Sequence, residues 1–444
     1  MTGAAALPER PPFVVRARLL TPLPNGEFLH EDDARVEVDA AGRIAAVAPW
    51  TDAAADPSVQ PAHDLRPWVL MPGLVDLHVH LPQIPNAGLG AGLGLLEWLE
   101  RYIFPLEHAF DRATAEQQAP VAFRALARAG TTTIAAYAAL WPESTDACFA
   151  AAETHGIRAV IGKVMMDRLT YDESIAPGDI LETSLRQSAE LCERWHGADD
   201  GRLRYAFTPR FAVSCSTEML AESARLAAHY GAYWQTHLSE DANEIHEVQR
   251  CFPGARDYLD VYERAGGLGE RALLAHAIHL SDSEVQRLAA SGARVAHCPA
   301  SNLFLSSGMM PAGRYLDAGV RMGLGSDLAA GPELSLFSVM RAAAVTQRVL
   351  VLNGTAGPRP PLAPLDWLRM ATLDGARALG MGDQIGSIQV GKEADLVLVD
   401  ASLTAPLPGL PDPAEPEELV SRLIFRPHPD MVRGAWVRGK RLPA

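Results

Sequence analysis

The chain has 444 residues, of which 48% are hydrophobic and 21% are charged, and its formal net charge is −15. A surface with this excess of acidic groups repels phosphate groups, so we expect neither nucleic acid nor an anionic membrane as a partner. Five widely spaced cysteines, with no Cys-x-x-Cys pair, argue against a disulfide framework and a thiolate zinc site and favour a reducing cytoplasm.

The two ends of the chain have the pattern of short strands. Residues 13–20, 34–47 and 386–442 combine apolar runs with turn-forming Pro and Gly. We therefore predict one small β-sandwich domain formed by residues 1–70 and 386–444 together. The first residues, MTGAAALPERPPF, lack a basic segment followed by an apolar core, so we expect no signal peptide. No apolar run approaches the ~20 residues of a membrane helix.

Residues 71–385 alternate short apolar runs with helical patterns such as 119–128 and 217–229. Alternating strands and helices indicate a parallel sheet, and eight repeats predict an α/β fold, a closed (β/α)8 barrel of the TIM type, as the catalytic domain. Active sites of such barrels lie at the carboxyl ends of the strands. The eight runs are residues 69–80, 131–138, 157–166, 202–211, 232–240, 272–280, 293–301 and 320–327.

Ionisable side chains stand at the ends of four of these runs. His78 and His80 end the first run, and residues two apart on a strand point to the same face, so their imidazoles could bind one cation. The alternative is a pair of ordinary polar residues at a strand end. His237, His276 and Asp327 interrupt three other apolar runs, where buried ionisable groups are costly unless they are paired or bound to metal.

Three imidazoles and one carboxylate suit zinc and also ferrous iron, with water at an open position. Glu240 lies three residues beyond His237, where it could reach a substrate without binding the metal, as a proton shuttle must. Its other interpretation is a carboxylate that stabilises the start of a helix, and both interpretations can hold. Trp98 could line the pocket or belong to the core of a helix, and we favour the core.

In this order, the motifs resemble the amidohydrolase superfamily and, within it, the guanine deaminases. The resemblance extends from about residue 72 to residue 400. Its motifs are PGLVDLHVHLPQIPNAG (72–88), LLEWLERYIFPLEHAF (95–110), FTPRFAVSCS (207–216), THLSED (236–241), HCPASNLFLSSG (297–308) and GLGSDLAAG (323–331).

The resemblance implies a metal-dependent hydrolase that converts guanine to xanthine and ammonia, and a homodimer. It implies that Glu240 passes a proton from the attacking water to a ring nitrogen and that His276 orients or polarises this water. Asp327 would serve both as a ligand and as a proton acceptor. The implied metal ligands are His78, His80, His237 and Asp327.

The resemblance further implies that Gln83, Arg210 and Phe211 contact the purine, with Arg210 facing its carbonyl oxygen. An arginine donor at this position would select guanine over adenine, which has no acceptor there. Many superfamily members carry a lysine late in the fourth strand that bridges two metals, but residues 202–211 contain none. We therefore expect one Zn²⁺ per chain, with Fe²⁺ as the alternative.

Two other hypotheses stay open at this point. The same chemistry could act on 8-oxoguanine, a pterin or an aminotriazine such as ammeline, which presents a similar amide-and-amine edge. A barrel that serves as a non-catalytic scaffold is less favoured, because such proteins typically lose metal ligands, and here the complete set is present.

Overall fold

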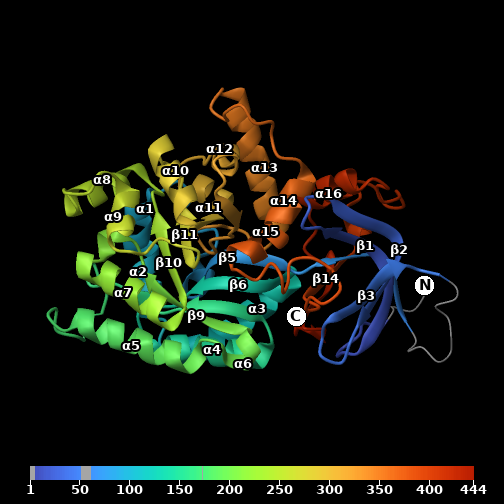
Figure 1. The fold of residues 1–444 in the computed structure, drawn as a ribbon, viewed down its shortest axis with the longest axis horizontal. Helices are drawn as coiled ribbons and strands as arrows, with labels where there is room; N and C mark the ends of the chain where they lie inside the picture. Colours follow the sequence, from blue (N-terminus) through green and yellow to red (C-terminus); the bar gives the residue numbers. More distant parts are fainter. Residues whose placement is uncertain (1–5, 52–61, 173) are drawn as a thin grey trace.

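The computed structural model describes residues 6–51, 62–172 and 174–444. Residues 1–5, at the start of the segment with no expected signal peptide, and residues 52–61 of the predicted small domain lie outside this description. The chain forms a barrel, on the left in Figure 1, and beside it a sheet built from both chain ends, on the right.

Within the described residues, eight parallel strands form a nearly closed barrel, and a short further strand, β8, pairs with β9. Most strand residues are buried, as expected for a parallel sheet covered by helices. The barrel closes where the Asp327 N–H donates to the His78 carbonyl (2.8 Å) and the His80 N–H to the Leu328 carbonyl (2.9 Å). The strands are β5 (Leu74–His80), β6 (Thr131–Tyr137), β7 (Arg158–Gly162), β8 (Val164–Met165), β9 (Leu203–Pro209), β10 (Tyr233–Leu238), β11 (Ala272–His276), β12 (Arg294–His297) and β13 (Arg321–Leu324).

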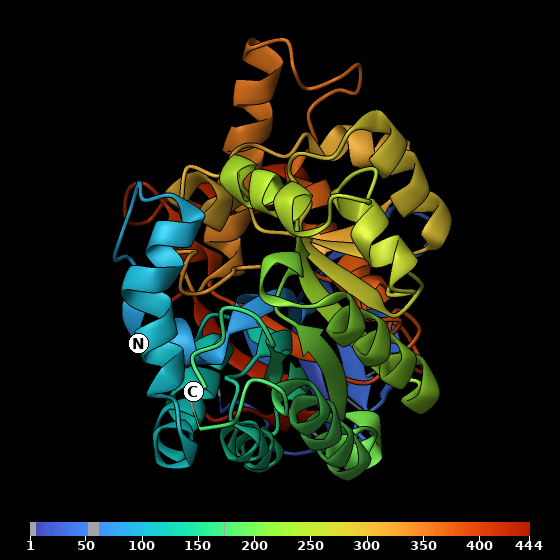
Figure 2. The same ribbon diagram turned by 90° about the vertical axis from the view of Figure 1, so that its left-hand side faces the viewer.

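Helices surround the barrel, as Figure 2 shows from the side of the strand ends. Local sequence fixes their limits: the Ser216 hydroxyl accepts the Met219 N–H (3.0 Å) at the start of α7, and Gly231, with φ of +61°, ends it. The helices are α3 (Arg112–Arg128), α4 (Pro142–His155), α5 (Ile180–Trp195), α6 (Ala198–Gly201), α7 (Thr217–Tyr230), α8 (Ala242–Cys251), α9 (Tyr258–Arg264), α10 (Asp282–Ser291), α11 (Pro299–Phe304), α12 (Ala312–Asp317), α13 (Leu336–Leu352), α14 (Pro364–Met370) and α15 (Leu373–Ala378).

Short helical turns after β5 cover the mouth of the barrel. They are η2 (Leu81–Asn86), α1 (Leu95–Trp98), η3 (Leu99–Ile103) and α2 (Phe104–His108). We call residues 95–108 the cover segment.

The second sheet joins both chain ends, and in the described residues its strand order is β16-β15-β14-β4-β1-β2-β3. Its apolar interior includes Phe13, Val36, Leu398 and Trp436. Its strands are β1 (Phe13–Pro22), β2 (Phe28–Val38), β3 (Ile44–Pro49), β4 (His63–Pro72), β14 (Leu396–Val399), β15 (Val432–Val437) and β16 (Lys440–Arg441), and η5 (Ala401–Thr404) and α16 (Pro416–Phe425) follow β14.

Three predicted strand runs divide differently in the structure, and one of them, residues 157–166, forms both β7 and β8. Residues 34–47 form parts of two antiparallel strands, because a turn at Asp39–Gly42 interrupts them. The run 69–80 also splits: β4 ends at Pro72 in the small sheet and β5 begins at Leu74 in the barrel. Gly73 joins them, and a Cβ there would lie 2.1 Å from the Thr132 hydroxyl oxygen, so only glycine fits.

A buried ion cluster ties the base of the barrel to the C-terminal part of the chain. Arg158, at the start of β7 and fully buried, contacts Glu393 (2.5 Å) and Asp395 (2.9 Å). Burial lowers the pKa of Arg158, but these two carboxylates outweigh it and raise the pKa above its usual value. The cluster fixes the barrel strand against the chain segment that enters β14.

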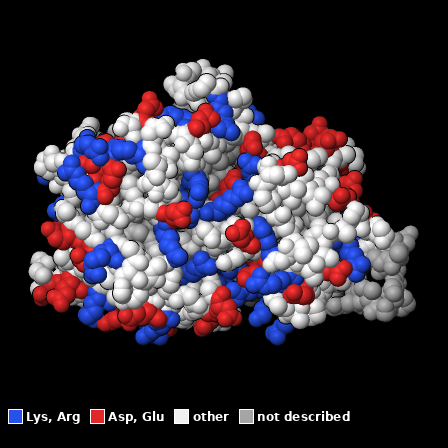
Figure 3. Space-filling view, in the orientation of Figure 1, with Lys and Arg blue, Asp and Glu red and all other residues white. Residues whose placement is uncertain are grey.

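The molecular surface mixes both signs of charge. On the face shown in Figure 3, acidic side chains are frequent at the periphery and basic ones gather near the centre. Among the helices of the described residues, none is long and apolar enough to cross a membrane.

Candidate metal-binding active site

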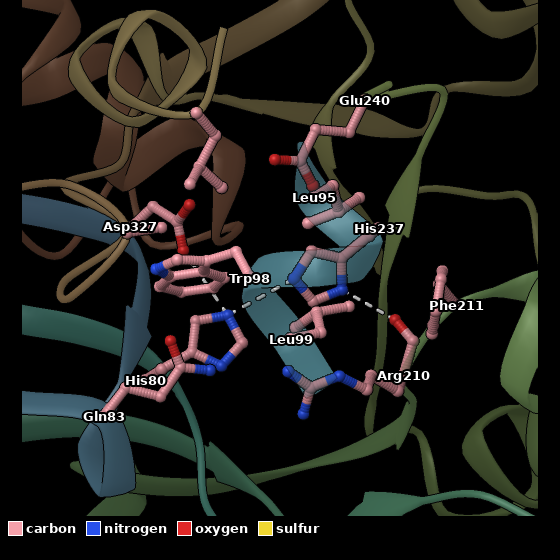
Figure 4. Close-up of a pocket in the computed structure, with 12 residues that line it drawn as sticks. His80, Gln83, Leu95, Trp98, Leu99, Arg210, Phe211, His237, Glu240 and Asp327 are labelled. Atoms are coloured by element: carbon pink, nitrogen blue, oxygen red, sulfur yellow. Dashed lines mark hydrogen bonds and ion pairs between the residues drawn. The ribbon is translucent and has the colours of Figure 1, made fainter. Parts of the chain in front are cut away.

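Four side chains predicted as metal ligands converge at the carboxyl ends of the barrel strands. The Nε2 atom of His80 lies 3.1 Å from Nε2 of His78 and 3.2 Å from Nε2 of His237. The Oδ1 atom of Asp327 lies 3.2 Å from Nε2 of His78 and 3.4 Å from Nε2 of His80. All four are buried, and Figure 4 shows three of them facing one another. Residues up to 249 positions apart in the chain thus meet at one point.

The separations of these donor atoms fit one divalent cation. Two ligand atoms at about 2.1 Å from a metal, with angles of about 90–110° between them, lie about 3.0–3.4 Å apart. Burial and the neighbouring imidazoles hold the pKa values of His80 and His237 well below the usual histidine range. Neutral imidazoles are the form that binds a metal, so the donor set and its environment suit a cation.

Neighbouring groups orient two of these ligands. The Nδ1 atom of His237 lies 2.6 Å from the Arg210 carbonyl, so donation there leaves Nε2 free to bind a metal. Ser301 donates to Oδ2 of Asp327 (2.5 Å). Burial raises the pKa of Asp327, but the neighbouring His78 imidazole and the Ser301 hydroxyl stabilise its charged form, so its pKa is lowered overall. No sequence pattern singles out Ser301.

His276 and Glu240 stand beside this cluster. The Nε2 atom of His276 is 3.4 Å from Oε2 of Glu240 and 3.8 Å from Oδ2 of Asp327. Its Nδ1 atom is 2.9 Å from Oδ1 of Asn302, which fixes the ring. Burial raises the pKa of Glu240 well above its usual range, and the charge of Asp327 raises it further. Glu240 can therefore hold a proton as well as release one.

The backbone is constrained at the same strand ends. Ser239, His276 and Asp327 have φ values of +51°, +70° and +48°, in the left-handed region that non-glycine residues seldom adopt. Such conformations gather at functional sites, where the surrounding structure holds them.

A narrow pocket opens beside the cluster (Figure 4). Six apolar and six polar or charged side chains line it, a combination that suits a flat heterocycle with polar edges. Trp98 is buried in the apolar core, as expected, and it also lines this pocket. The lining residues are His80, Gln83, Leu95, Trp98, Leu99, Arg210, Phe211, His237, Glu240, Leu305, Asp327 and Ala330.

The three residues expected to contact substrate all line the pocket. Phe211 follows β9, and Gln83 lies in η2. Arg210 is held by Glu107, whose Oε1 and Oε2 atoms lie 2.7 Å and 2.5 Å from its Nη1. Burial alone would lower the pKa of Arg210, but Glu107 raises it, so the guanidinium stays charged. The sequence did not single out Glu107, which is one of several acidic residues in the helical pattern of the cover segment.

A (β/α)8 barrel with three histidines and one aspartate converging at its mouth is the fold and site of a metal-dependent hydrolase. The sequence model of the Amidohydrolase family matches residues 69–442. A probable guanine deaminase of Deinococcus radiodurans is 38% identical over 415 residues, 92% of this chain and 92% of that protein. The chain belongs to the amidohydrolase family and, within it, to the guanine deaminases.

Two solved structures are similar over nearly their whole length. Guanine deaminase from C. acetobutylicum, with guanine bound in its active site, has a TM-score of 0.88 and 29% identity, covering 97% of this chain and 99% of that chain. An adenosine deaminase from Xanthomonas campestris with bound zinc has a TM-score of 0.81 and 30% identity, covering 98% of this chain and 93% of that one.

Proposed function

We propose that the protein hydrolyses guanine to xanthine and ammonia with the help of one bound metal ion. The observation that carries this proposal is the convergence of His78, His80, His237 and Asp327 beside a pocket that Arg210 also lines. Zinc is the metal we propose, with ferrous iron as the alternative, because the donor set suits both. The zinc-bound relative supports this choice.

The four ligands would hold the metal, which, when bound, lowers the pKa of a water towards neutrality. Glu240 accepts a proton from the attacking water and donates it to a ring nitrogen of guanine. His276, fixed by Asn302, orients the water towards the amine-bearing carbon. A carbon–oxygen bond forms, and the added hydroxyl then gives up its proton, which Asp327 or Glu240 relays to the amine. The carbon–nitrogen bond breaks as the C=O group forms, and the amine leaves as ammonia.

Arg210 and Gln83 would read the amide edge of the base, and Phe211 would pack against its ring. Arg210 donates to the carbonyl oxygen, an acceptor that adenine lacks. Guanine is favoured over 8-oxoguanine, pterins and ammeline because relatives at 38% identity, and a structure with bound guanine, are guanine deaminases. We further propose that the protein is a homodimer, as the family resemblance implies. We also propose that it acts in the cytoplasm, because its five cysteines are free thiols, which suit a reducing compartment.

The proposal is tested by removing metal with a chelator and adding back Zn²⁺ or Fe²⁺. We expect the metal-free protein to release no ammonia from guanine, and about one equivalent of metal per chain to restore equal amounts of ammonia and xanthine. Full activity without any bound metal would contradict the metal-dependent part of the proposal, and ammonia release without xanthine would contradict the reaction.

A further inference from the structure

Glu107 lies behind the pocket and touches both polar side chains that would recognise the substrate. It is fully buried in α2 and is not among the residues that line the pocket. Its carboxylate accepts from Arg210 (2.5 Å and 2.7 Å) and from Nε2 of Gln83 (2.9 Å). Tyr171 donates a further hydrogen bond to Oε2 (3.1 Å). One carboxylate therefore fixes two side chains that come from different strand ends.

The contact with Glu107 decides which end of the Gln83 amide is available. Because the NH₂ group donates to Glu107, the Oε1 atom is left over, and within the described residues this buried oxygen has no hydrogen-bond partner. A buried acceptor without a partner is costly unless a ligand supplies a donor. The Gln83 oxygen thus offers an acceptor, while Arg210, next to it on the same carboxylate, offers donors.

The carboxylate of Glu107 also offsets the positive charge of Arg210. The two buried groups, 2% and 0% exposed, form a neutral pair, so the guanidinium can donate hydrogen bonds without presenting an uncompensated charge to a neutral ring. The phenyl ring of Phe104 covers the guanidinium, with 5.6 Å from its carbon to the ring centre. A donor beside an acceptor, held rigidly, is complementary to a C=O group next to an N–H group.

We propose that Glu107 is the positioning residue of substrate recognition, holding Arg210 and Gln83 as a donor–acceptor pair that selects heterocycles with an adjacent C=O and N–H. This inference rests on the proposed function, because it concerns how the same pocket distinguishes its substrate. It assigns Glu107 no part in proton transfer. It also ties the cover segment, which carries Glu107, to the strand end that carries Arg210.

The test compares two ligands in the metal-loaded enzyme and in Glu107→Gln. Guanine has the C=O and N–H edge, whereas 2-aminopurine keeps the ring and the amine but lacks both groups. The measurements are kcat and KM for guanine and the competitive inhibition constant of 2-aminopurine. Glu100→Gln, an exposed acidic residue of the same cover segment, is the matched control.

We expect Glu107→Gln to raise KM for guanine by about tenfold to a hundredfold, the range for loss of a hydrogen bond to a charged group. The inhibition constant of 2-aminopurine should change by less than about threefold, and Glu100→Gln should change neither value. Equal effects on both ligands would show a merely structural role and overturn the inference, as would an unchanged KM.

Tyr171→Phe tests the inference if Glu107→Gln does not fold. It removes one hydrogen bond from Glu107 and leaves both charges in place. We expect the ratio of KM for guanine to the inhibition constant of 2-aminopurine to rise by about threefold or more. An unchanged ratio in this variant would overturn the inference. If the wild-type enzyme releases no ammonia from guanine, the proposed function fails and the inference with it. If the wild-type enzyme is active on guanine but this ratio does not change in the variants, the inference fails while the proposed function stands.

Discussion

Replacing Glu240 with glutamine keeps the shape of the side chain and removes its capacity to carry a proton. Its Oε2 atom lies 3.4 Å from Nε2 of His276, and the Ser307 hydroxyl lies 3.4 Å from Oε1, so an amide can keep both neighbours. Loss of a positioned acid–base group costs about 10²–10⁴ in rate, which is about 2.7–5.4 kcal/mol in the activation free energy. We expect kcat for guanine to fall by this factor in Glu240→Gln.

The metal content of Glu240→Gln should equal that of the wild type, because the clustered donor atoms belong to other residues. The assay follows xanthine formation and ammonia release together with metal analysis of the same samples. Glu247→Gln, a carboxylate in α8 that pairs with Arg250, is the control and should retain wild-type kcat. A Glu240→Gln enzyme within about tenfold of wild type would refute the proton-transfer role, and loss of metal would show that Glu240 supports the binding site instead.

Three further outcomes follow from buried charges. Arg210→Lys keeps the charge beside Glu107 but loses the planar fork of donors, so KM for guanine should rise about tenfold in steady-state assays; an unchanged KM would place recognition elsewhere. Arg158→Met leaves the buried Asp395 without its guanidinium partner, while Glu393 keeps Arg438 (2.8 Å), so chemical denaturation should show a loss of about 3 kcal/mol in the free energy of unfolding, whereas a loss below about 1 kcal/mol would contradict this. Burial lowers the pKa of Lys163 to about 7, so the unfolded chain binds its proton more tightly and wild-type stability rises with pH between about 7 and 10.5. Relative to Lys163→Met, this rise should be about 1.4 kcal/mol per pH unit, and parallel stability curves would exclude it.

The sequence predicted the barrel and the convergence of its ionisable strand-end side chains because both depend on regular patterns. Ionisable residues at the ends of apolar runs identified His78, His237 and Asp327, and the geometry of a parallel barrel brings such ends together. The strand limits were less accurate, since apolarity continues through Gly73 although the chain passes there from one sheet to the other. The division of the chain at residues 70 and 386 stays a prediction.

The side chains that support the site could not be predicted from sequence. Glu107 lies in a helical stretch whose other acidic residues, Glu97 and Glu100, are exposed, and no periodicity separates a buried carboxylate from its exposed neighbours. Only the tertiary contact with Arg210 reveals it. The sequence also could not show that Trp98 both packs in the core and lines the pocket, because one side chain can do both.

Ammonia release from a panel of guanine, 8-oxoguanine, pterin and ammeline tests the central claim most directly. With the zinc-loaded enzyme, we predict the highest kcat/KM for guanine, with xanthine as the product in equal amount. No turnover of guanine, together with efficient turnover of another member of the panel, would contradict the account.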